Sequence, residues 1–168
     1  MYQRILVPLD GSPTSNCGLT EAMKLAKLTG AHLRLLHVVD EMPFIMSAEG
    51  YGAMTTDVLA LLREAGEKIL QQARTLVKDN GIPVDTVLFD SFGGRVCDRV
   101  VEQVKEWHAD LVVLGTHGRR GVRRMLLGSD AEQVLRTSPV PVLLVRGPEA
   151  HSLEETTLAA RPRSAQGD

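Results

Sequence analysis

Cysteine, aromatic side chains and long apolar runs are all scarce in this sequence of 168 residues. The two cysteines, Cys17 and Cys97, stand in unrelated segments, with neither metal-ligand spacing nor a disulfide framework. The longest apolar runs, such as residues 140–145, fall far short of a membrane span. The first residues meet a proline, an aspartate and a glycine too early for a signal peptide. We therefore expect a cytoplasmic protein.

An excess of charge of one sign is also missing, since 19 Lys and Arg stand against 21 Asp and Glu. This balance argues against a generic polyanion binder and against a polybasic membrane-surface protein. The length suits one globular domain, which would bury roughly 70% of the surface of the unfolded chain. We predict a single domain over residues 1–146. The remaining tail, 147–168, has little that could pack, and its composition predicts disorder.

Short apolar segments alternate with helical patterns along the domain. The first predicted helix has Ser12 as N-cap, Pro13 at its first position and Gly30 as its stop. Residues 40–54 show no periodicity and are interpreted as a loop. Strands are predicted over 4–9, 31–39, 84–89, 111–115 and 140–145, and helices over 13–29, 56–79, 95–107 and 130–136. The apolar face of the long second helix is predicted to comprise Val58, Leu62, Ala65, Ile69 and Leu76.

This alternation, with central strands apolar on both faces, predicts an α/β fold with helices on both sides of a parallel sheet. Five strands and four helices fit a doubly wound domain with a mainly parallel sheet. Such folds bind ligands beyond the carboxyl ends of their strands. Pro141 favours an edge position for the last strand, and an apolar edge is a plausible seam for a homodimer.

The most informative segment runs from Gly115 to Ser129, from a strand's carboxyl end to a helix N-terminus. Its glycines would let backbone N–H groups approach an oxyanion, and its four arginines meet no acidic residue before Asp130. These features indicate a polyphosphate cradle. The alternative is that the glycines serve turn geometry and the arginines form a solvated face. Neither a Walker A loop nor the dinucleotide-binding glycine pattern after the first strand is present.

The spacing G-x2-G-x9-G-S, carried by Gly115, Gly118, Gly128 and Ser129, resembles the ATP-binding motif of the universal stress protein family, of which UspA is the type. Three further segments resemble the family in order and place: residues 5–12, 35–38 and 138–145. The resemblance covers about residues 1–146.

The resemblance implies a Rossmann-like fold of the adenine nucleotide alpha hydrolase type, ATP as ligand, often with Mg²⁺ or Mn²⁺, and a homodimer formed through the last strand. The residues that it implies for ATP binding are Pro8, Asp10, Val38, Gly115, Thr116, His117, Gly118, Arg119, Arg120, Gly121, Gly128, Ser129 and Asp130. Those that it implies for the dimer strand are Val140, Val142, Leu143, Leu144 and Val145.

Single residues leave alternatives open. Asp10 could contact the ligand or cap the following turn. Asp130 could stabilise the start of its helix or repel a triphosphate, in which case it lowers ATP affinity or raises the dependence on a divalent cation. His37, within a buried strand, is interpreted as a core histidine with a satisfied hydrogen bond. His117 has no carboxylate or serine partner nearby in sequence and is not a convincing general base.

Three classes of function compete. We expect an ATP-binding regulatory module of the stress response that acts as a dimer, hydrolyses ATP slowly at most and has no assigned catalytic residue. An ATP hydrolase or phosphotransferase would need a positioned base and an acceptor, for which the sequence offers weak candidates. An interaction module without nucleotide, acting on proteins or nucleic acid, is the third; the balanced charge and few aromatics make nucleic acid unlikely.

Overall fold

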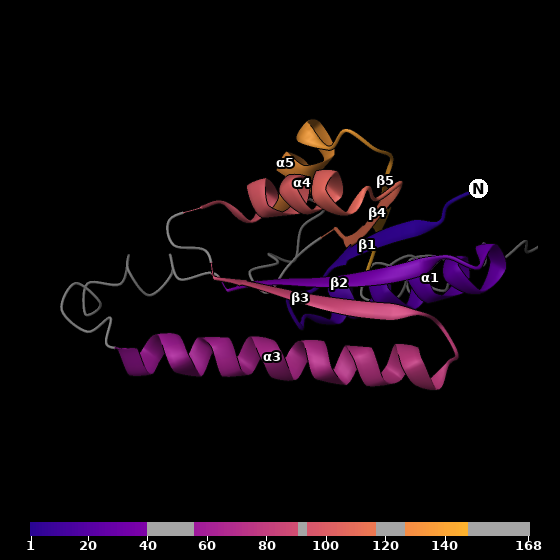
Figure 1. The fold of residues 1–168 in the computed structure, drawn as a ribbon. Coiled ribbons are helices and arrows are strands. Elements are labelled where there is room, and N and C mark those ends of the chain that lie inside the picture. Colours follow the sequence, from indigo (N-terminus) through magenta and orange to yellow (C-terminus); the bar gives the residue numbers. More distant parts are fainter. Residues whose placement is uncertain (40–55, 91–93, 117–126, 148–168) are drawn as a thin grey trace, which may run out of the picture.

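The computed structural model describes residues 1–39, 56–90, 94–116 and 127–147 (Figure 1). Its strands and helices alternate along these residues, as the sequence predicts. In chain order they are β1 (Arg4–Pro8), α1 (Pro13–Thr29), β2 (His32–Val39), α3 (Thr56–Asp79), β3 (Val84–Asp90), α4 (Val96–Trp107), β4 (Leu111–Gly115), α5 (Ser129–Thr137) and β5 (Val142–Val145).

The strands form one sheet in the order β3-β2-β1-β4-β5, and each neighbouring pair is parallel. The predicted doubly wound α/β fold is therefore confirmed. From β1 the chain builds outward through β2 to β3, then returns to the other side of β1 with β4. The strand order thus reverses between β1 and β4, and a crevice for a ligand forms at the carboxyl edge beside such a point.

Helices α1 and α3 cover one face of the sheet, and α4 and α5 cover the other (Figure 1). Successive side chains of a strand point to opposite faces, so neighbouring residues of β1 enter different cores. Ile5 and Val7 pack with residues of α1 and α3, whereas Leu6 packs with residues of α4 and α5. All three are fully buried. Burying such a side chain contributes about 1.5–3 kcal/mol, so β1 is a main source of the stability that holds the carboxyl edge in place.

Helix α1 begins and ends where the sequence predicts. The Ser12 side chain accepts a hydrogen bond from the Ser15 backbone N–H at 3.1 Å, which satisfies a donor of the first turn. Gly30 closes the helix in the left-handed conformation, with φ of 71°, which a glycine adopts without strain.

Other boundaries differ by one or two residues. Strand β5 begins at Val142, not at the predicted residue 140, because Pro141 lacks an N–H and Val140 belongs to a turn in which its carbonyl accepts from the Ser138 hydroxyl. Strand β1 ends one residue early, at Pro8, strand β2 begins one residue late, and β3 ends one residue late. Helix α4 begins one residue late, and α5 extends one residue further at each end.

The predicted apolar face of α3 is partly wrong. Ala65 is exposed and Leu76 is 49% exposed, while the most buried positions are Gly66, Leu70, Ala73 and Val77. Two predicted positions are displaced by one residue, Ala65 in place of Gly66 and Leu76 in place of Val77, because apolar spacing does not show which of two adjacent stripes of a helix packs on the sheet. Helix α3 lies close against the sheet at Gly66, since a Cβ there would lie 2.6 Å from Cδ2 of His37.

The interpreted loop at 40–54 and the predicted tail beyond Gly147 lie outside the described residues. Within the described ones, no helix has the length and apolar character needed to cross a membrane.

Candidate functional site

The candidate site lies at the carboxyl edge of the sheet, around the ends of β1, β2 and β4. Pro8 is the last residue of β1 and Gly115 the last of β4, and the two strands are neighbours. Val38 lies near the end of β2, which continues beyond β1: the β1–β2 ladder ends with Pro8 opposite Leu36. Predicted site residues from distant parts of the sequence thus come to one edge.

Asp10 stabilises the turn that leads from β1 into α1. Its Oδ1 accepts a hydrogen bond of 2.9 Å from the backbone N–H of Ser12, the N-cap of α1. The capping alternative for Asp10 is therefore confirmed. Contact of the same side chain with a ligand stays a prediction.

Gly115, the first glycine of the motif, is required by packing. A Cβ at this position would lie 2.8 Å from the carbonyl carbon and oxygen of Thr14, in the first turn of α1. Backbone atoms cannot move aside as a flexible side chain would. The close approach of α1 to β4 therefore accounts for this glycine whether or not a ligand is present. Sequence reasoning credited the residue only to turn geometry or phosphate contact, because the partner lies about 100 positions away.

Thr116 connects the end of β4 to its neighbours on both sides. Its N–H donates to the Val145 carbonyl at 2.9 Å, and its carbonyl accepts from the N–H of Gly128 at 2.8 Å. The second bond closes the loop between β4 and α5 at its base. Gly128 and Ser129, the last two motif residues, are consequently held beside the end of β4.

The N-cap of α5 is a glycine. Gly128 has φ of −60° and ψ of 146°, and it has no side chain that could accept from the first turn. The first N–H groups of any α-helix lack intrahelical acceptors and carry a partial positive charge, so an anion would be favoured at this end. Asp130 and Glu132 provide negative charge within the first turn, and Asp130 is exposed.

The charge of Asp130 also affects a cysteine in the first turn of α4. Burial, followed by the carboxylate of Asp98, raises the pKa of the Cys97 thiol, and Asp130 adds a smaller contribution in the same direction. Cys97 is 3% exposed and its Sγ lies 3.7 Å from Oδ1 of Asp98. A thiol with a raised pKa stays protonated at neutral pH, so Cys97 is a poor nucleophile. Asp98 of α4 and Asp130 of α5 therefore both raise the pKa of the Cys97 thiol.

His37 confirms its interpretation as a satisfied core histidine. It is 6% exposed, and its Nδ1 lies 2.7 Å from the carbonyl oxygen of Leu9. Leu9 also donates its N–H to the carbonyl of Leu36 at 2.8 Å. Sequence reasoning missed that this histidine contacts the β1–α1 connection. The available signal was a single titratable residue within an otherwise apolar strand.

The middle of the glycine loop lies outside the described residues. His117, Gly118, Arg119, Arg120 and Gly121 all fall there, so their part in the site stays a prediction. Among the residues that are described, no group of three or more His, Cys, Asp and Glu side chains could hold a metal ion.

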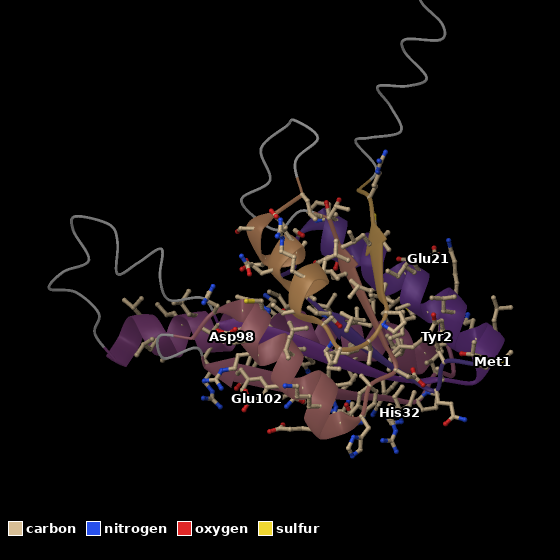
Figure 2. All side chains as sticks on the ribbon, turned by 90° about the horizontal axis from the view of Figure 1, so that it is seen from above. Met1, Tyr2, Glu21, His32, Asp98 and Glu102 are labelled. Carbon is tan, nitrogen blue, oxygen red and sulfur yellow. The ribbon has the colours of Figure 1, made fainter. Side chains whose placement is uncertain are left out.

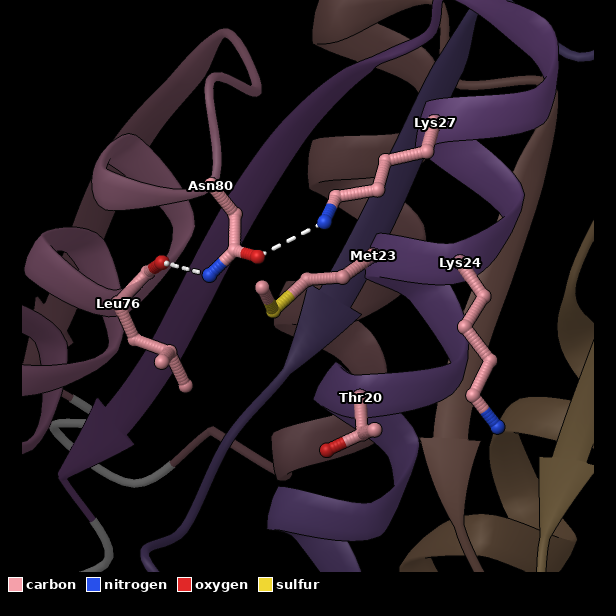
Figure 3. A pocket seen from close by; sticks show the side chains of 6 residues that line it. All are labelled: Thr20, Met23, Lys24, Lys27, Leu76 and Asn80. Carbon is pink, nitrogen blue, oxygen red and sulfur yellow. Dashed lines mark hydrogen bonds between the residues drawn. The ribbon is translucent and has the colours of Figure 1, made fainter.

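A depression of about 230 Å³ lies elsewhere, between α1 and the end of α3 (Figure 3). The Lys27 ammonium donates to Oδ1 of Asn80 at 2.8 Å and so joins the two helices across one side of it. Both residues lie where their helices end, toward the amino ends of the strands. The depression is therefore separate from the carboxyl edge, and it contains none of the predicted ATP-binding residues.

Strand β5 forms one margin of the sheet (Figures 1 and 2). Its residues are partly exposed, with Leu143 at 36%, whereas every residue of the inner strand β1 from Ile5 to Val7 is fully buried. The edge position that Pro141 favoured is confirmed. Pairing of this edge with a second chain stays a prediction, and Val140 of the predicted dimer strand lies outside the strand itself.

The fold and site together define a doubly wound α/β protein with its candidate site at the switch point of the sheet. Residues 1–146 match the universal stress protein family. The chain belongs to this family.

Individual relatives agree with that assignment. The chain is 33% identical over 150 residues to the universal stress protein MJ0531 of Methanocaldococcus jannaschii, covering 89% of this chain and 85% of that protein. Its fold is similar to the solved structure of MJ0577 from the same organism, with a TM-score of 0.75, 26% identity and coverage of 87% and 96%. A universal stress protein crystallised in complex with cAMP is 27% identical, with a TM-score of 0.60 and coverage of 86% and 97%.

Proposed function

We propose that this chain binds ATP at the carboxyl edge of its sheet and acts as a dimeric, cytoplasmic regulatory module of the stress response. The observation that carries the proposal is the N-terminus of α5, where the N-cap is a glycine and so offers no side-chain acceptor of its own to the first turn. The Thr116–Gly128 hydrogen bond holds this N-terminus beside the end of β4. A phosphate group would satisfy those donors.

The adenosine end of the ligand would lie on the opposite side of the crevice, over β1 and β2. In a parallel ladder where the Leu9 N–H bonds the Leu36 carbonyl, the main-chain groups of Leu36 and Val38 face β1. Because the β1–β2 ladder ends with Pro8 opposite Leu36, the main-chain groups of Val38 lie beyond the part of β2 that is paired with β1. The relative with bound cAMP supports an adenine nucleotide as the ligand class.

Arg119 and Arg120 in the loop would neutralise the phosphates. A Mg²⁺ or Mn²⁺ ion would enter with ATP, held chiefly by the phosphate oxygens, because the described residues supply no cluster of ligands. When bound, the ion would offset the repulsion between the triphosphate and Asp130. We expect hydrolysis to be slow at most, because Asp10 and His117 are only weak candidates for a positioned general base.

The proposed dimer forms through the exposed edge of β5. An edge strand with apolar side chains offers unpaired backbone groups and apolar area to a second copy. Val142 and Leu144 are half-buried within one chain and Leu143 is 36% exposed.

Thermal unfolding of the Gly128→Asp variant tests the site because stability and binding should change in opposite directions. The extended backbone at this N-cap suits aspartate, which should leave stability unchanged or raise it by a few tenths of a kcal/mol. The new carboxylate would occupy the position of the phosphate. We therefore expect the increase in Tm caused by ATP and Mg²⁺ to be lost in this variant.

The matched control is Gln71→Glu, which adds the same charge at an exposed position of α3. It should retain the ATP-dependent increase of the wild type. If Gly128→Asp responds to ATP as strongly as the control, the α5 N-terminus is not the phosphate site. If the wild type itself does not respond to millimolar ATP, the chain is a member that acts without nucleotide, through protein partners.

A further inference from the structure

We propose that His37 is a positioning residue for the nucleotide site: by holding the Leu9 carbonyl, it keeps the edge of β2 at Val38 open to the ligand. This inference rests on the proposed function for its ligand. The position of His37 itself is argued from its contacts with Leu9 and Gly66.

The hydrogen bond between His37 and Leu9 can run in only one direction. A carbonyl oxygen can only accept, so the 2.7 Å contact between Nδ1 of His37 and the Leu9 oxygen requires a proton on Nδ1. Because His37 is 6% exposed, water does not compete effectively for this bond. The contact is therefore a fixed tie between β2 and the residue that follows β1.

Without His37, the Leu9 carbonyl would have a different partner. The Leu9 N–H donates to the Leu36 carbonyl. If the parallel ladder continued, the N–H of Val38 would donate the next hydrogen bond, to the Leu9 carbonyl. The observed ladder ends one residue earlier, at Pro8 and Leu36. The imidazole of His37 takes the carbonyl instead. A side chain thus ends the strand pairing at the point where the proposed adenine contact begins.

Helix α3 limits the space available to the imidazole ring of His37. A Cβ at Gly66 of α3 would lie 2.6 Å from Cδ2 and 3.0 Å from Nε2 of His37. Any larger residue at position 66 would push the imidazole toward β1 or out of its rotamer. Gly66 is buried, so helix α3 sets the position of the ring, and the ring sets the position of Leu9.

The hydrogen bond between His37 and Leu9 lies next to predicted site residues in the sequence. Leu9 stands between Pro8 and Asp10, and Asp10 in turn accepts the N–H of Ser12 at 2.9 Å. Loss of the His37 bond would free the Leu9 carbonyl to pair with Val38 and would loosen the turn before α1. Both effects act on the proposed adenosine end and leave the phosphate end at Gly128 unchanged.

Two variants separate the donor from mere bulk. His37→Leu removes the donor, whereas His37→Asn retains an amide N–H near the position of Nδ1. The loss of one hydrogen bond predicts that ATP binding by His37→Leu weakens about tenfold and that His37→Asn recovers most of it. Val77→Ala is the matched control, since Val77 is a fully buried residue of α3 at the other end of the helix. It should lower Tm without weakening ATP binding.

Two measurements on the protein alone keep the inference testable apart from the ligand. Nitrogen-detected NMR of the wild type should show a slowly exchanging proton on Nδ1 of His37. Exchange of the amide hydrogens of residues 9–12 should be about tenfold faster in His37→Leu than in Val77→Ala at equal stability. A wild type that binds no ATP but shows both signatures overturns the proposed function and leaves the tie intact. An unprotonated Nδ1, or equal exchange in the two variants, overturns the role of His37.

Discussion

At the scale of single residues, several positions serve a structural purpose that a sequence pattern also assigns to a ligand. Gly115 is fixed by the backbone of Thr14, and Asp10 caps the turn before α1. Gly128 differs, since it is an N-cap without a side-chain acceptor. Asp130, two residues later, places a negative charge in the first turn of α5, and we propose that this charge weakens the binding of an anion there.

Replacing Asp130 with asparagine should tighten ATP binding and lower stability. The substitution removes a negative charge beside the phosphate site, but it also removes a favourable charge from the helix N-terminus. A charge in this position is worth about 0.3–1 kcal/mol, which predicts a two- to fivefold change in Kd. Calorimetric titration with ATP, with and without Mg²⁺, measures the effect.

Glu132→Gln is the matched control for that charge. Glu132 accepts from Nη2 of Arg136 at 2.8 Å and so points along the helix, away from its N-terminus. Equal changes in Kd for the two variants would show that only the net charge matters. No change in Asp130→Asn would show that the carboxylate is remote from the ligand.

At the scale of elements, patterns close together in the sequence predict the structure well. The N-cap at Ser12, Pro13 and the stop at Gly30 defined α1 correctly because capping depends on neighbouring residues. Contacts between distant segments could not be predicted. Gly66 beneath His37 and Gly115 beneath Thr14 depend on how closely α3 and α1 lie on the sheet. The same cause displaced part of the predicted face of α3, in which Leu76 is exposed.

The contact between α1 and β4 predicts the effect of Gly115→Ala. Its new Cβ would overlap the Thr14 backbone at 2.8 Å and force the helix away from the sheet. Overpacking of this kind costs about 1–3 kcal/mol, which chemical denaturation would detect as a lower midpoint. Gly94→Ala is the control, because its Cβ would lie 3.6 Å or more from the Arg99 side chain. Similar stabilities for the two variants would contradict the close approach.

At the scale of the whole molecule, the sheet order brings the ends of β1, β2 and β4 to one edge and leaves β5 at a margin. The alternation of strands and helices predicted this class of fold, and Pro141 predicted the margin. The sequence alone could place the glycine motif at a strand end. It could not show that Thr116 joins β5 and the start of α5 through its two backbone bonds. That link connects the proposed dimer edge with the proposed phosphate site.

The proposed dimer predicts that Leu143→Glu separates the chains. A carboxylate on the exposed side chain of β5 would be buried or repelled at a seam between two copies. Sedimentation velocity should then give the mass of one chain, against twice that mass for the wild type. Leu28→Glu, at a 79% exposed position of α1, should remain dimeric. A dimeric Leu143→Glu variant would place the interface elsewhere.

The central claim is that this chain binds ATP, and calorimetric titration of the wild type tests it most directly. ATP added in the presence of Mg²⁺ should give a saturable heat with one nucleotide bound per chain. The same titration of Gly128→Asp should give none. Saturation of the wild type together with loss in the variant is the predicted result. A wild type that gives no binding heat at millimolar ATP would contradict the account.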